Sequence, residues 1–138
     1  MLGPLTDDGY LWLHDVTLPG WLGSLEHLVV GPTGVWVVGS GQGRRRLPGE
    51  AGAPAGILRG LRWQTEAIAE LLDGWASVPV RSLLCVHGRW SSGPRSFQGS
   101  QVVAPRQLAQ VVHSGSPVAP DEVERAAARL LEVLRPAA

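Results

Sequence analysis

The sequence predicts a single α/β domain with a mixed central β-sheet, and three observations support this class. First, apolar residues on both sides of a Gly-Pro-Thr-Gly turn within residues 25–38 indicate a β-hairpin. Second, apolar residues recur with a helical period in 57–75 and again in 120–134. Third, the apolar run at 80–87 lies between these helices and suits a buried strand. Strands interleaved with helices are typical of an α/β domain.

Each expected element has a local reason. Residues 10–18 are rich in aromatic and apolar side chains, and Pro19 ends them. Pro120 and the two acidic residues after it favour the start of the closing helix, because the proline has a fixed φ and negative charge suits a helix N-terminus. In chain order we expect strands at 10–18, 25–30 and 35–38, a helix at 57–75, strands at 80–87 and 101–104, and helices at 105–113 and 120–134.

Three segments between these elements carry few large apolar side chains. Residues 1–9 predict an irregular arm, and residues 88–99 predict a loop. Residues 39–56 are rich in Gly, Arg and Pro and predict a flexible surface loop. With no internal repeat and no composition break, residues 1–138 are expected to form one domain.

The charged residues narrow the chemistry. The chain has 138 residues with 12 basic and 12 acidic side chains, and every basic residue is an arginine. The absence of lysine excludes a Schiff base, a phosphate-loop lysine and a lysine-dependent nuclease site. Zero net charge gives no overall attraction to nucleic acid, so binding to DNA or RNA requires a local arginine patch.

The apolar and cysteine content points to a cytoplasmic protein. Cys85 is the only cysteine, so an internal disulfide and a four-thiolate zinc site are both excluded. We expect Cys85 to be an inert packing residue on a buried strand. No apolar run reaches the ~18 residues of a membrane span, and no signal peptide opens the chain, so no membrane association is expected.

Residues 13–38, LHDVTLPGWLGSLEHLVVGPTGVWVV, resemble the nuclease-related domain (NERD) family. The similarity continues through LRWQTEAI (61–68), VPVRSLLCVHGRW (78–90), the VVAPRQLAQVV segment and the closing helix. This family belongs to the restriction-endonuclease-like PD-(D/E)xK superfamily. The resemblance implies a restriction-endonuclease-like fold, with a mixed central sheet flanked by helices and a metal-dependent nuclease site.

The resemblance also implies where that site would lie. The first family carboxylate maps to Glu26, and a glutamine placed near the phosphate maps to Gln64, whereas the second carboxylate and the lysine map to Gly39 and Gly41. If Val30 pairs with Val35, the hairpin register sets Glu26 opposite Gly39 and Ser24 opposite Gly41. Such neighbours have Cβ atoms ~5 Å apart, close enough for two carboxylates to share a divalent cation. In this chain glycines stand in place of the second carboxylate and the lysine, so the resemblance is to a degenerate member of the family.

Three functions stay open at this point. The leading hypothesis is a catalytically inactive nuclease-like module that binds nucleic acid or a protein partner. The second is an active Mg²⁺- or Mn²⁺-dependent DNA or RNA nuclease with a relocated site that uses Glu26 and Gln64 with Asp15 or Glu50, in which Glu26 and Asp15 hold the metal. The third is a purely structural or protein-interaction domain, such as a homo-oligomer. No cofactor is expected unless the second hypothesis holds.

Two further features bear on binding. Arg44, Arg45 and Arg46 form the only charge run and are the first candidates for contacts to phosphates. The chain also has six tryptophans, and an exposed indole can stack on a base or anchor a protein. Three of them fall within expected elements and are predicted to be core: Trp12, Trp36 and Trp63.

Overall fold

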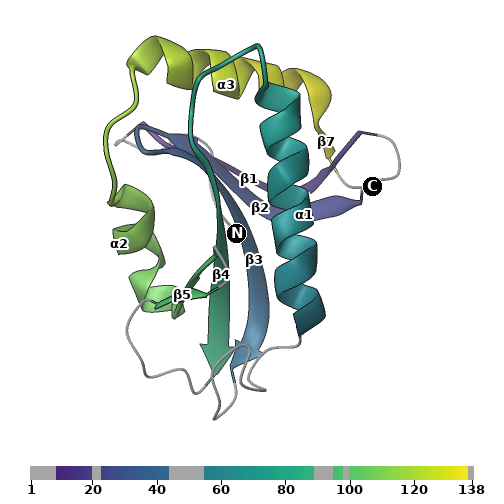
Figure 1. Ribbon diagram of the computed structural model, residues 1–138, viewed down its shortest axis with the longest axis vertical. Coiled ribbons are helices and arrows are strands. Elements are labelled where there is room, and N and C mark those ends of the chain that lie inside the picture. Colours follow the sequence, from purple (N-terminus) through teal and green to yellow (C-terminus); the bar gives the residue numbers. More distant parts are fainter. Residues whose placement is uncertain (1–8, 20–22, 44–54, 89–94, 98–99, 137–138) are drawn as a thin grey trace.

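The computed structural model describes residues 9–19, 23–43, 55–88, 95–97 and 100–136. They form an α/β structure in which helices cover both faces of a mixed β-sheet (Figure 1). The strands are β1 (Leu11–Thr17), β2 (Ser24–Gly31), β3 (Gly34–Gly43), β4 (Val80–Gly88), β5 (Arg95–Phe97), β6 (Ser100–Val103) and β7 (Arg135–Pro136). The helices are α1 (Ala55–Leu72), the short 3₁₀ turn η1 (Pro105–Gln107), α2 (Leu108–His113) and α3 (Pro120–Val133).

Among the described residues, the sheet has seven strands in the order β5-β6-β4-β3-β2-β1-β7. Strands β1, β2 and β3 form an antiparallel meander, and β4 then pairs in parallel with both β3 and β6. Helix α1 connects β3 to β4, which is the crossover that a parallel pair requires. The predicted α/β class and mixed sheet are therefore confirmed.

The two faces of the sheet bury separate cores, because successive strand residues point to opposite sides. Helices α1 and α3 pack on one face, through Leu58, Ile68 and Leu130 among others. Helix α2 packs on the other face. The strand residues of the first core include Leu28, Val30, Val35, Val37, Leu84 and Val86. Those of the second include Val29, Trp36, Val38, Leu83, Cys85 and Val103. In Figure 1, α1 lies in front of the sheet, α3 crosses at the top and α2 stands apart from both.

The hairpin turn is tied to α2 by a buried hydrogen-bond network around Thr33. The Thr33 hydroxyl donates to the carbonyl oxygen of Val112 at 2.5 Å, and the Trp36 indole N–H donates to Thr33 Oγ1 at 3.2 Å. The Tyr10 hydroxyl lies 2.9 Å from the same oxygen. One small side chain thus joins the start of β1, the β2–β3 turn and the end of α2.

Two glycines of the turn are required by their surroundings. A Cβ atom on Gly31 would lie 2.2 Å from the Tyr10 ring, so any side chain would displace that ring. Gly34 has a φ of +111°, and a Cβ there would lie 2.7 Å from the backbone oxygen of Pro79. The Gly-Pro-Thr-Gly segment is therefore explained by the packing of the hairpin.

The predicted loop at 39–56 is wrong over its first five residues, and also over residues 55 and 56, where α1 begins. Strand β3 runs on to Gly43, because Gly39 to Gly43 pair in parallel with Leu84 to Gly88 of β4. Ladder hydrogen bonds to an adjacent strand outweigh the low strand propensity of glycine. Residues 44–54 lie outside the described part, as does the expected arm except for Gly9.

Other boundaries also differ from the expectation. The predicted loop at 88–99 contains β5, which pairs with β6, and the predicted closing helix is followed by β7, which pairs with Val16 and Thr17. Both strands have three residues or fewer, too short for a periodic pattern to reveal. Within the described residues, no helix is long and apolar enough to cross a membrane.

Candidate functional site

Glu26 lies where β2 and β3 separate, and its carboxylate accepts two hydrogen bonds from Ser40. The hairpin register is as expected as far as His27, which pairs with Val38. Beyond that pair, Glu26 Oε1 accepts the Ser40 backbone N–H at 3.3 Å, and Oε2 accepts the Ser40 hydroxyl at 2.5 Å. The exposed carboxylate therefore takes the place of ladder hydrogen bonds that β2 no longer supplies.

Gly39 and Gly41 both lie in β3 and pair with Leu84 and Val86 of β4. A Cβ atom built on Gly39 would lie 3.3 Å from Leu61 Cδ1, so this position faces α1. Ser40, the next residue, faces the opposite side of the strand. The Glu26 side chain was expected to face Gly39. This is wrong, because the Glu26 carboxylate accepts its hydrogen bonds from Ser40.

Gln64 of α1 is half-buried, and its side-chain amide donates to the backbone oxygen of Ser24 at 2.9 Å. Ser24 is the first residue of β2. This inward, hydrogen-bonded placement agrees with the apolar stripe of α1, in which Gln64 falls between Leu61 and Ile68. Gln64 and Glu26 thus both serve as hydrogen-bond partners for backbone at the end of the hairpin.

Asp15 does not join Glu26 in a shared site. It has a φ of +51° and forms no pair, although His14 and Val16 on either side pair with β2. Its side chain is 78% exposed and lies 3.6 Å from His14 Nδ1. Across the residues that the structure describes, no group of three or more His, Cys, Asp or Glu side chains is placed to hold a metal ion.

His27 is a residue that the sequence pattern did not single out. It lies directly opposite His14 on β1, and its Nδ1 atom is buried with no hydrogen-bond partner among the described residues. Burial lowers the pKa of His27 below 6.5, and the neighbouring Glu26 carboxylate opposes part of that shift. The signal in the sequence was the pair of dipeptides His-Asp and Glu-His, which the β1–β2 register places side by side.

Cys85 is buried as expected. It pairs with Ser40 across β3 and β4, and its side chain belongs to the core on the α2 face of the sheet. Burial raises the pKa of the thiol, and the Glu26 carboxylate adds to the effect. A thiol held in the protonated form is a poor nucleophile, which fits a packing role.

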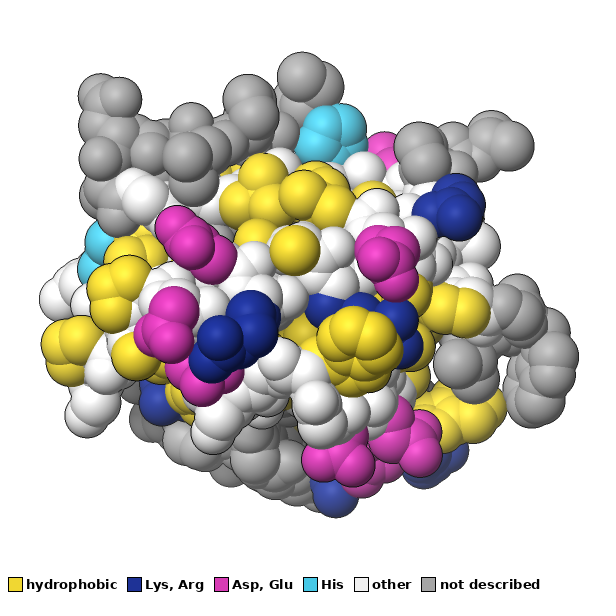
Figure 2. Space-filling view, turned by 90° about the horizontal axis from the view of Figure 1, so that it is seen from above, with side chains coloured by type: hydrophobic (Ala, Val, Ile, Leu, Met, Phe, Trp, Pro, Cys, Tyr) yellow, Lys and Arg dark blue, Asp and Glu magenta, His cyan; other side chains and the backbone are white. Residues whose placement is uncertain are grey.

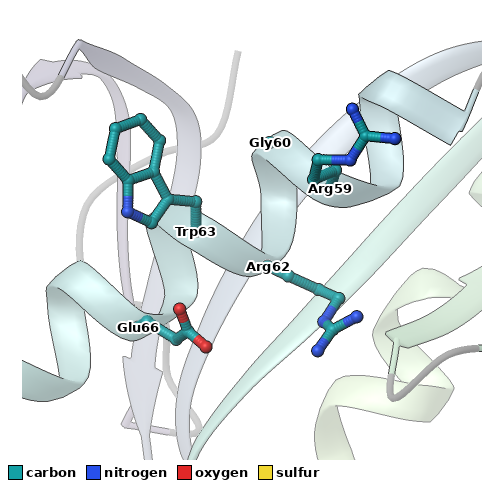
Figure 3. Close-up of a pocket in the computed structure, with 5 residues that line it drawn as sticks. All are labelled: Arg59, Gly60, Arg62, Trp63 and Glu66. Atoms are coloured by element: carbon teal, nitrogen blue, oxygen red, sulfur yellow. The ribbon is translucent and has the colours of Figure 1, made fainter.

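The outer face of α1 carries an exposed cationic and aromatic group. Trp63 was expected in the core, but 56% of it is exposed, because it projects on the side of α1 away from the buried stripe. Together with neighbouring residues it lines an open hollow of about 520 Å³ (Figure 3). The lining residues are Arg59, Gly60, Arg62, Trp63 and Glu66.

The other arginines are placed differently. Arg44, Arg45 and Arg46, and also Glu50, lie outside the described residues. On α3, Arg125 pairs with Glu122 at 2.6 Å, and Arg129 pairs with Glu132 at 3.4 Å. Seen from above, the face that includes α3 intersperses acidic and basic side chains (Figure 2).

Comparison of the chain with known proteins identifies no family. No protein-family model, no curated protein and no solved structure matches the chain.

Proposed function

We propose that this chain is a catalytically inactive nuclease-like module that binds nucleic acid. The proposal includes a restriction-endonuclease-like, NERD-type fold for the mixed sheet. The resemblance over residues 13–38 supports it, as does the adjacency of the four strands expected to form the sheet: β1, β2, β3 and β4.

The observation that carries the inactive assignment is the engagement of Glu26 by Ser40. A divalent-cation site needs several oxygen ligands, usually including a second acidic side chain near the first. Here both Glu26 oxygens accept hydrogen bonds from Ser40, and the positions of the second acid and the lysine are glycines. The carboxylate that the family uses for chemistry serves here to close the end of the hairpin.

A relocated nuclease site has less support. Asp15 is directed toward His14 rather than Glu26, and Gln64 is engaged with the backbone of Ser24. The chain has no lysine, so no lysine ammonium group can stabilise the negative charge that develops on the phosphate in the transition state. A protein-interaction role is the remaining alternative, and it predicts no affinity for nucleic acid at low salt.

The test is a cleavage assay with single- and double-stranded DNA and RNA in Mg²⁺ and in Mn²⁺. We expect every substrate to stay intact with the wild-type protein. We expect Glu26→Ala to lower the free energy of unfolding by about 0.5–1.5 kcal/mol, because the Ser40 hydrogen bonds are lost. Metal-dependent cutting by the wild type that Glu26→Ala abolishes would show an active enzyme instead.

A further inference from the structure

We propose that the outer edge of β1, together with an apolar groove beside it, binds an extended basic peptide that adds a strand to the sheet. The peptide pairs antiparallel with residues 11–14, places an apolar side chain in the groove between β1 and α3, and directs a lysine or arginine at Glu124. This inference goes beyond the proposed function and does not depend on whether the chain binds nucleic acid.

One side of β1 is open over most of its length. The inner side of the strand pairs with β2 from Leu11 to Thr17. On the outer side, the described residues supply partners only for Val16 and Thr17, which pair with β7. Residues 11–14, Leu-Trp-Leu-His, contain no proline, arginine or carboxylate of the kind that shields sheet edges. This stretch therefore offers an unprotected edge to another chain.

The register of the sheet identifies which backbone groups of β2 face β1. The Val35 N–H donates to the Pro79 carbonyl oxygen beside β4, at 2.9 Å, so the backbone groups of Val35 face away from β2. In an antiparallel pair of strands, residues that exchange hydrogen bonds alternate with residues that do not. Val30, which pairs with Val35, therefore directs its N–H and carbonyl groups at β1, and so does Leu28.

The outward-facing backbone groups of β1 consequently belong to Trp12 and His14. Val30 and Leu28 pair with Leu11 and Leu13, whose backbone groups are therefore bonded to β2. The N–H and carbonyl groups of Trp12 and His14 point to the outer side instead. Two donors and two acceptors thus stand in a row, spaced to pair with alternate residues of an added strand.

Strand β7 indicates the direction that an added strand takes. It already pairs antiparallel with the C-terminal end of the same edge, at Val16 and Thr17. Asp15 forms no pair and has a φ of +51°, and it separates this occupied part from residues 11–14. An antiparallel peptide opposite residues 11–14 runs in the same direction as β7 and continues its row in the sheet.

An apolar groove of about 470 Å³ lies beside this edge. Leu11 of β1 and Val30 of β2 line it together with Val123 and Ala127 of α3. Leu11 thus belongs both to the open edge and to the groove. Side chains of an added strand alternate between the two faces of the sheet, so every second side chain of the peptide lies on the same face as Leu11. A leucine there enters the groove and buries its side chain against α3.

The charges around the groove favour a basic peptide. Among the described residues that line the groove, Glu124 is the only charged one. It forms no ion pair with a described residue, whereas Asp121 and Glu122 both contact Arg125. Asp15, whose side chain is 78% exposed, follows the other end of the open edge. These carboxylates attract a peptide with a lysine or arginine near each end and repel an acidic one.

Other occupants match these features less well. A second copy of β1 paired antiparallel about Trp12 would set its Asp15 opposite Gly9, which lines the groove together with Glu124, so two carboxylates would approach each other. A small apolar ligand would fill the groove but leave the outward backbone groups of Trp12 and His14 without partners.

The experiment is amide hydrogen exchange, followed residue by residue by NMR, on the whole chain with a capped synthetic peptide, Lys-Thr-Leu-Thr-Leu-Thr-Lys. In the free protein we expect slow exchange at Leu11 and Leu13 and fast exchange at Trp12 and His14. Peptide at about ten times its dissociation constant should slow exchange at Trp12 and His14 by about 10-fold.

Variants of the peptide test each contact and leave the protein unchanged. Replacing both leucines with alanine should weaken binding by about 10-fold or more, because the groove loses its apolar occupant. Replacing the central threonine with proline should abolish the slowing of exchange, because proline has no N–H to donate to the edge. Replacing both lysines with glutamate should weaken binding by about 2- to 10-fold at low salt.

A pair of matched protein variants tests the charge. Glu124→Gln should weaken binding of the lysine peptide by about 2- to 5-fold and reduce its dependence on salt. Glu70→Gln removes an exposed carboxylate of α1 that does not line the groove, and it should leave binding unchanged.

Three results would overturn the inference. The first is unchanged exchange at Trp12 and His14 with about 1 mM of the lysine peptide. The second is slow exchange of these two amides in the free protein, which would show that the edge is already occupied, by a second copy if analytical ultracentrifugation finds a dimer and by the chain itself if it finds a monomer. The third is equal binding of the glutamate peptide, which would contradict a site for basic peptides.

Discussion

Thr33 connects three elements of the fold through hydrogen bonds of its one hydroxyl group. Its hydroxyl donates to Val112 while the Trp36 indole N–H donates to its oxygen, and the Tyr10 hydroxyl lies beside it. Gly31 leaves the space that the Tyr10 ring fills. The Gly-Pro-Thr-Gly-Val-Trp segment, the most distinctive part of the sequence, is therefore evidence about the fold and not about chemistry.

Thr33→Val tests this role. The substitution keeps the shape but leaves the buried Trp36 indole N–H without its acceptor, and it leaves the Val112 carbonyl with only the long 3.4 Å hydrogen bond from the Tyr10 hydroxyl. We expect the free energy of unfolding to fall by about 1–3 kcal/mol in urea denaturation. Thr65→Val is the control, since that hydroxyl bonds only to the Leu61 carbonyl within α1. Equal losses in the two variants would contradict a special role for Thr33.

Burial of His27 makes the free energy of unfolding depend on pH, and the direction of its pKa shift fixes the sign of that dependence. Its folded pKa is lowered from 6.5 by burial, so both folded and unfolded chains hold it neutral above that pH. As pH falls below 6.5, the unfolded chain takes up a proton first, and the free energy of unfolding falls until the folded pKa is passed.

The measurement is urea denaturation from about pH 8 to about pH 5, across the range in which histidine titrates. We expect His27→Gln to remove part of the loss of stability at the acidic end. A His27→Gln profile as steep as that of the wild type would show that burial of this ring does not set the dependence.

At the scale of elements, the periodic patterns located the sheet and the long helices. The four-residue turn at 31–34 predicted the register that pairs Val30 with Val35, and the stripe through Leu58, Leu61 and Ile68 predicted the buried face of α1. The extension of β3 to Gly43 was not predictable, because it depends on pairing with β4, distant in sequence. The prediction that Trp63 is a core residue was wrong, because Trp63 lies within helix α1 but at an angular position outside the buried apolar stripe.

Gly60→Ala tests the openness of the α1 surface. The glycine is exposed inside the helix, and an added methyl group meets nothing within 4 Å. We expect thermal and chemical denaturation to show a gain of about 0.5–1 kcal/mol in stability, because alanine loses less conformational freedom on folding. A loss of stability would mean that the surface beside Trp63 is more crowded than the structure indicates.

At the scale of the molecule, the fold class was predictable and the site was only partly so. Gln64 lies inward with a hydrogen bond, as its place in the stripe indicated. The Glu26 contact with Ser40 was not predictable, because it depends on where β2 leaves β3 and on which way a long side chain turns. The run at Arg44, Arg45 and Arg46 lies outside the described residues, so its role in binding phosphates stays a prediction.

For the whole molecule, the proposed function is a scaffold in which Glu26 bonds to Ser40 and which binds nucleic acid without cutting it. An enzyme would turn its substrate over, while a binding module returns it unchanged. These two behaviours differ in one observable, the length of the bound strand.

The most direct measurement is to hold a labelled single strand in complex with excess protein and Mn²⁺, and then to follow its length by gel over many hours. We expect a saturable complex from which the strand is recovered at full length, with Glu26→Ala indistinguishable from the wild type. Progressive shortening of the strand that requires both Mn²⁺ and Glu26 would contradict the account.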